Sequence, residues 1–132
     1  MLDDLDGAER WVDNWESSIA DRAAKVKTFA EQGAGVTGIA SDPDRVVEVT
    51  VDSSGVVTGL YLSERVRRVP APELGDLILS VMRAAQANLA QRMAEVAAET
   101  MGEDSDLTRS IAASYERRFP TEPPEGGEPY GR

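Results

Sequence analysis

Apolar residues in the first thirty positions recur at alternating steps of three and four. They are Leu5, Ala8, Val12, Trp15, Ile19, Val26 and Phe29. This spacing predicts one long helix from about Leu2 to Gln32, with a narrow apolar stripe that is typical of a coiled-coil seam. Arg22 interrupts the stripe. Trp11 and Trp15 are four residues apart and share a face, where packing against a second copy of the chain is favoured over stacking on a ligand.

The next segment changes to a period of two, which is typical of β-strands. The pattern predicts strands at 36–40, 45–51 and 56–63, separated by turns at 41–44 and 52–55. A two-residue loop at 53–54 sets the expected pairing, which joins Val51 to Val56, Val49 to Thr58 and Val47 to Leu60.

Each face of this hairpin has a distinct composition. The face expected to form the core carries Val47, Val49, Val51, Val56, Leu60 and Leu62. The opposite face is mixed and carries Val46, Glu48, Thr50, Val57 and Tyr61. Its apolar members, Val46, Val57 and Tyr61, are expected to contact a second copy of the chain.

The period of a helix returns after two prolines. Pro72 suits a helix start, and Gly102 suits its end. The apolar stripe between them consists of Leu74, Leu77, Ile78, Val81, Ala85, Leu89, Met93 and Val96. The chain therefore divides into an α+β domain at 1–102, a short helical extension at 103–119 capped by Ser105, and a tail at 120–132. The tail is rich in proline, glycine and glutamate and is expected to be disordered.

Composition narrows the classes of function. The chain has 132 residues, no cysteine, no histidine and a net charge of −10. The commonest general base and the thiolate metal ligands are therefore missing. The acidic loop residues Asp42, Asp44 and Asp52 lack calcium-loop spacing and read as turn residues. No catalytic residue, metal or cofactor is expected. No signal peptide or membrane-spanning run is visible, so a cytoplasmic location is expected.

Two short motifs remain. Residues 33–38 match G-x-G-x-x-G, but a helix precedes them and a strand follows, the reverse of a dinucleotide-binding site. Arg65, Arg67 and Arg68 form the only dense basic cluster, and the hairpin places Arg45 at the same end. Such a patch can hold phosphates, or it can be a charged sheet edge that resists aggregation. Both interpretations stay open.

The span from 37 to 102 resembles the YbaB/EbfC family of bacterial nucleoid-associated proteins. The resemblance rests on the hairpin RVVEVTVDSSGVVTGLYLS, the link RVRRVPAPE and the following helix. The matching helix positions are Leu74, Asp76, Leu77, Ile78, Ala84, Ala85 and Met101. Family members form homodimers in which the sheets join and the helices project like tweezers, and they bind DNA without catalysis.

The resemblance implies that this chain binds DNA at the nucleoid, mainly through backbone phosphates. The residues expected to bind DNA are Arg45, Arg65, Arg67 and Arg68, with Lys25 and Lys27 secondary on a separate surface. The dimer interface is expected to include Trp11 and Trp15 besides the sheet residues. The C-terminal extension and acidic balance look like actinobacterial members, some associated with type VII secretion. A protein-interaction adaptor that uses the helical stripes and the tail is therefore the alternative, and net charge favours it.

Overall fold

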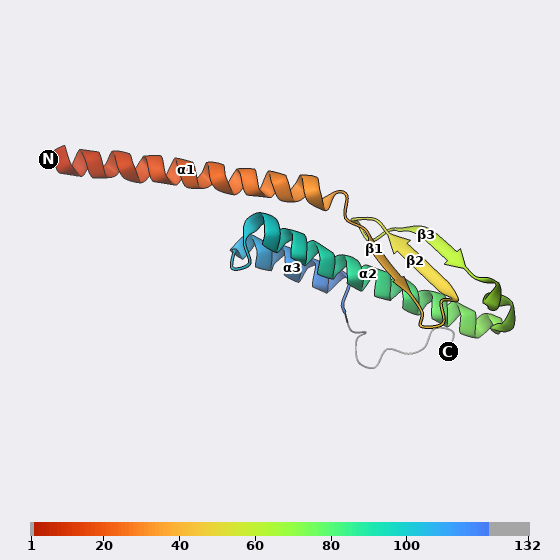
Figure 1. Ribbon diagram of the computed structural model, residues 1–132. Coiled ribbons are helices and arrows are strands. Elements are labelled where there is room, and N and C mark those ends of the chain that lie inside the picture. The colour runs from red at the N-terminus through yellow and green to blue at the C-terminus, as the bar shows by residue number, and fades with distance from the viewer. Residues whose placement is uncertain (1, 122–132) are drawn as a thin grey trace.

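The computed structural model describes residues 2–121, with side chains from residue 6 onward. Helix α1, Leu2–Gly33, runs out from the rest of the chain as a long arm (Figure 1). Its C-terminal end meets the body, where Phe29 packs against the core and Gly33 is buried beside Met93. The long first helix that the sequence predicts is confirmed, and most of its length is free of other described elements.

Three strands follow α1 as an antiparallel meander. They are β1, Gly38–Ser41; β2, Val47–Val51; and β3, Val57–Leu62, in the spatial order β1-β2-β3. Helix α2, Ala71–Met101, crosses one face of this sheet. The crossing is close at Gly38, where an added Cβ would lie 2.2 Å from the carbonyl oxygen of Ala85. Only glycine allows β1 to approach α2 to this distance.

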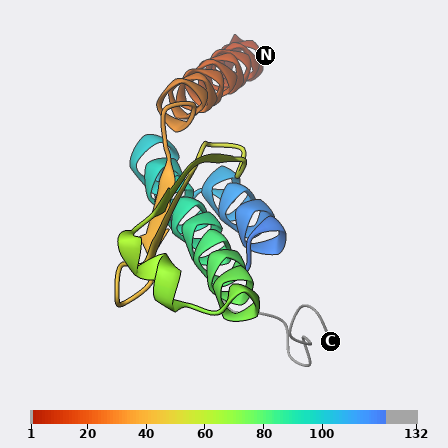
Figure 2. The same ribbon diagram turned by 90° about the vertical axis from the view of Figure 1, so that its right-hand side faces the viewer.

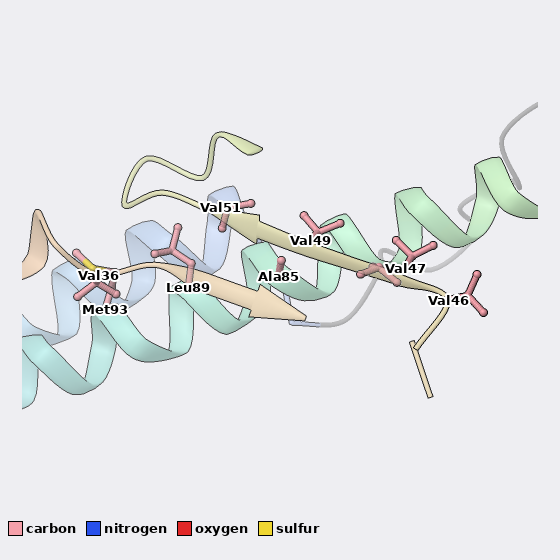
Figure 3. Packing of buried hydrophobic residues seen from close by; sticks show 9 residues of the cluster. Val36, Val46, Val47, Val49, Val51, Ala85, Leu89 and Met93 are labelled. Carbon is pink, nitrogen blue, oxygen red and sulfur yellow. The ribbon is translucent and has the colours of Figure 1, made fainter. Parts of the chain in front are cut away.

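The core lies between β2 and α2. Figure 3 shows the valines of β2 lined up over α2, with Val46 at the end of the row. The buried cluster consists of Val36, Val46, Val47, Val49, Val51, Val81, Ala85, Leu89 and Met93. Its β2 members come from alternate positions, so the period-two pattern of the sequence correctly identifies the inward face of this strand.

The expected hairpin register is wrong. Val51 pairs with Val57, Val49 with Leu60 and Val47 with Leu62, and a bulge interrupts the ladder between Thr50 and Val51. The turn is longer than two residues because the Asp52 carboxylate accepts hydrogen bonds from the backbone N–H groups of Ser54 and Val56, at 2.9 and 3.1 Å. Gly55 completes the turn with a φ of 86°.

The expected core face is also wrong on β3. Leu60 and Leu62 lie opposite Val49 and Val47, yet they are 51% and 40% exposed, and Val56 is exposed too. The reason is width: α2 lies over β1 and β2 and does not reach β3. Val46, expected on an outer face, is instead buried.

Helix α3, Asp106–Arg118, begins at the predicted cap, where the Ser105 hydroxyl accepts from the Leu107 N–H. It lies beside α2 (Figure 2), and its side chains contact the β2–β3 turn. Three successive turn carbonyls accept side-chain hydrogen bonds: Ser53 from Tyr115, Ser54 from Arg118 and Gly55 from Gln86. The ring of Phe119 fills the space beside Gly55. The part of the expected tail at 122–132 lies outside the described residues.

Candidate nucleic-acid interface

The arginine cluster lies on a short 3-10 helix, η1, Glu64–Arg68, that links β3 to α2. Ser63 caps this helix, because its hydroxyl oxygen accepts from the Arg65 N–H at 3.2 Å. Val66 and Val69 are partly buried and pack against the core cluster. These two valines anchor the segment, so Arg65, Arg67 and Arg68 are exposed to solvent.

The neighbouring β1–β2 turn is held by a buried carboxylate. Asp42 is 7% exposed, and its carboxylate accepts hydrogen bonds from the N–H groups of Val47, at 2.7 Å, and Asp44, at 3.2 Å. The Arg45 N–H donates to the carbonyl of Asp42 at 3.0 Å. Arg45 has a φ of 56°, the only positive φ among the non-glycine residues described. This left-handed conformation costs about 1 kcal/mol, which the bonds to Asp42 offset.

The two segments meet at the end of the molecule opposite the free end of α1 (Figure 1). The Arg65 Nη1 donates to the carbonyl of Asp44 at 3.1 Å, which ties η1 to the β1–β2 turn. An open groove forms between them, lined by Pro43, Asp44, Arg45, Ser63, Glu64 and Arg65. Arg45 and Arg65, twenty positions apart in the sequence, therefore line one groove.

The four arginines are not equivalent. Side chains three residues apart lie on the same side of a 3-10 helix, which places Arg68 with Arg65 and Arg67 with Glu64. Arg67 forms an ion pair with Glu64 at 3.2 Å, and both side chains are at least 80% exposed. Such a pair adds little stability, but it sets a negative charge beside Arg67. The positive side of the site consists of Arg45, Arg65 and Arg68.

The other residues expected to bind DNA or a second copy are spread over several surfaces. Lys25 and Lys27 are exposed on α1, outside the arginine groove. Trp11 and Trp15 lie on the same helix and are exposed. Val57 and Tyr61 are exposed on β3, whereas Val46 is buried in its own chain and has little surface to offer.

Sequence reasoning missed the uncovered β3 side chains, Leu60 and Leu62. Their alternation with polar positions is the usual signal for a buried face, and it gives no sign that the covering helix is too narrow. It also missed Asn88, whose side-chain oxygen accepts from the Ile39 N–H of β1 at 3.0 Å. The outer edge of β1 is thus partly capped by α2, while β3 is the other edge of the sheet.

Residues 2–121 offer no metal site and no membrane-spanning helix. No group of three or more acidic side chains is arranged to hold a metal ion there. No helix in the same range combines the length and apolar character needed to span a membrane. The groove at η1 is the candidate site because its guanidinium groups are exposed and are suited to phosphate oxygens.

Comparison with known proteins gives one match. The model of the YbaB/EbfC DNA-binding family matches residues 14–104, which is more than two-thirds of the chain. No curated protein and no solved structure matches the chain. The matched span holds the sheet, η1 and α2, and it ends before α3.

Proposed function

Because this chain belongs to the YbaB/EbfC DNA-binding family, we propose that it is a nucleoid-associated, non-catalytic homodimer that binds DNA mainly through backbone phosphates. It would act in the cytoplasm, on the nucleoid. The observation that carries the binding site is the groove in which Arg65 bonds to the β1–β2 turn next to Arg45.

Phosphate binding follows from the chemistry of this groove. Arg45 and Arg65 line the groove, and Arg68 lies on the same side of η1 as Arg65. All three are exposed and held on two anchored segments, so they can meet phosphate oxygens without a large rearrangement. Asp44 and Glu64 also line the groove and limit its net charge. A net charge of −10 on the whole chain opposes approach to DNA. Binding should therefore be weak at physiological salt and should involve few phosphates per chain.

Homodimer formation is supported by the uncovered strand β3. Its edge is free within the described sheet, and its side chains Val57, Leu60, Tyr61 and Leu62 are all at least 38% exposed. An apolar strand edge of this kind is a template for pairing with another strand. The opposite edge is less suited because Asn88 already bonds to β1. Joining two sheets through β3 would cover Leu60 and Leu62 and give the dimer two arginine grooves.

The test is a fluorescence-anisotropy titration of a labelled DNA duplex over a range of salt concentrations. Log affinity should fall linearly with log salt, with a slope of about 0.9 per phosphate contact. Arg65→Ala/Arg68→Ala should weaken binding to all sequences alike and flatten the slope. Arg67→Ala should have a smaller effect, because Glu64 already pairs with Arg67. The matched control is Arg83→Ala/Arg117→Ala, which removes the same charge from exposed positions elsewhere.

Two outcomes would contradict the proposal. Equal losses in the η1 variant and the control would show that only overall charge matters. No binding by the parent at low salt would favour the adaptor, a protein-binding role. The observation that favours the adaptor is the acidic arm α1, which presents exposed Trp11 and Trp15.

A further inference from the structure

The arm α1 is a long exposed surface that the proposed DNA binding leaves without a role. Every residue from Asp6 to Thr28 is exposed. Trp11 and Trp15 are 66% and 55% exposed, and their rings stack with centroids 6.4 Å apart and planes 8° from parallel. Helices in water gain most of their stability by packing an amphipathic face, so this arm requires a partner.

The stripe on the arm has the geometry of a two-helix seam. Its members among the described side chains alternate steps of four and three: Ala8, Val12, Trp15, Ile19, Arg22 and Val26. This is the a/d pattern of a coiled coil, in which a second helix covers a narrow line of side chains. The stripe therefore fits another helix with the same spacing better than it fits a flat surface or a broad groove.

The distribution of charge along the arm favours a second copy of the arm in the antiparallel direction. Residues 2–21 carry seven acidic side chains and one basic, whereas residues 22–33 carry Arg22, Lys25 and Lys27 against one acid, Glu31. Two parallel copies would place acidic halves together, which is unfavourable. Two antiparallel copies would place each acidic half beside the basic half of the other.

The antiparallel arrangement also matches the stripe residue by residue. Centred at Ser17, it sets Trp15 level with Ile19 of the other copy, Val12 with Arg22 and Ala8 with Val26. Large residues then meet smaller ones, and the stem of Arg22 covers Val12. The guanidinium of Arg22 would lie within a turn of the other copy's Asp13. A single charged residue at a seam position is a known way to fix the register of a coiled coil.

We propose that α1 is a second self-association surface, on which the arms of two copies pair antiparallel about Ser17. This goes beyond the proposed function, in which two chains join through β3. The arm and β3 lie on different parts of the chain (Figure 1). Because each chain then has two different self-complementary surfaces, assembly does not stop at two chains and can link several dimers.

The first test measures assembly size by sedimentation velocity in four proteins. They are the parent, the arm variant Trp15→Glu/Ile19→Glu, the sheet variant Leu60→Thr/Leu62→Thr and the combination. The parent should form species larger than a dimer as concentration rises. Each variant should stop at a dimer, and the combination should sediment as a monomer of 14.2 kDa. Asn14→Glu/Ser17→Glu is the matched control, because it adds the same charge away from the stripe and should behave as the parent.

The second test reads orientation, and it does not depend on β3. The chain has no cysteine, so single cysteines report specific contacts. Glu9→Cys mixed with Ala23→Cys should give the mixed disulfide on mild oxidation. Parallel arms would hold these positions about 21 Å apart, at about 1.5 Å per residue. The two tryptophans of the chain both lie on α1, so their emission reports the arm alone and should shift to shorter wavelength on assembly.

The outcomes separate this inference from the sheet dimer. A mixed disulfide together with an unaffected sheet variant would support the arm pairing and contradict pairing through β3. An arm variant that assembles like the parent, or the absence of the mixed disulfide, would overturn the inference. A parent that stays dimeric with unshifted emission would also overturn it and would leave the arm to a different protein.

Discussion

The uncovered face of β3 gives the sharpest quantitative prediction. Leu60 and Leu62 share a face with the buried valines of β2, but they are 51% and 40% exposed. Replacing both by threonine keeps a strand-forming residue at each position and removes most of the apolar surface. The substitution should leave the single chain folded and should weaken the dimer.

The magnitude follows from the exposed fractions. Full burial of a leucine side chain stabilises by about 1.5–3 kcal/mol. Roughly half of each side chain is left for a partner to cover, which corresponds to about 1 kcal/mol each. A symmetric interface contains four such side chains, so the loss is about 4 kcal/mol, equivalent to a dissociation constant about a thousandfold higher.

Sedimentation equilibrium measures this change, with the arm variant as background so that only the sheet interface contributes. Ile39→Thr is the control, because Ile39 is 49% exposed on β1, at the edge away from β3. Its dissociation constant should stay close to that of the parent. A Leu60→Thr/Leu62→Thr dissociation constant within a few-fold of the parent would refute pairing through β3. So would equal weakening by the Ile39 control.

Two further predictions concern stability and are measured by urea denaturation. Phe119→Ala should lower the free energy of unfolding by about 2 kcal/mol, because it removes the partly buried ring beside Gly55; no change would show that α3 does not support the β2–β3 turn. Gly38→Ala should cost about 3 kcal/mol, since its Cβ would meet the backbone of α2 at 2.2 Å, whereas Gly35→Ala, with its nearest neighbour at 3.9 Å, should be close to neutral. Similar effects at the two glycines would contradict the close crossing of β1 and α2.

The order and type of the elements could be predicted from the sequence, because hydrophobic periodicity and the residues that begin or end an element are local signals. The stripe of α1, the valines of β2 and the cap at Ser105 each appear within a few residues. The hairpin register could not, since it depends on how the Asp52 side chain closes the turn and on the bulge beside Val51. The exposure of the β3 side chains could not be predicted either, because it depends on how far α2 reaches across the sheet.

The candidate site was predicted in part for the same reason. A hairpin brings its two ends together, so the proximity of Arg45 and Arg65 follows from topology alone. The difference between Arg67, which pairs with Glu64, and the other arginines depends on the 3-10 helix η1. The role of Asp42 was also hidden, because a turn aspartate in a sequence does not reveal whether its carboxylate is buried.

The three bonded carbonyls of the β2–β3 turn affect the entropy cost of association. Hairpin tips in many proteins fluctuate freely, and ordering them on binding costs conformational entropy. Here Tyr115, Arg118 and Gln86 fix the tip before any partner arrives. The turn that leads into β3 is therefore already ordered in the folded chain, and the conformational entropy of ordering it is not lost again on binding. Two of the three donors come from α3, outside the family-matched span, so in the proposed dimer this extension would affect how readily the sheet edge pairs with a second strand.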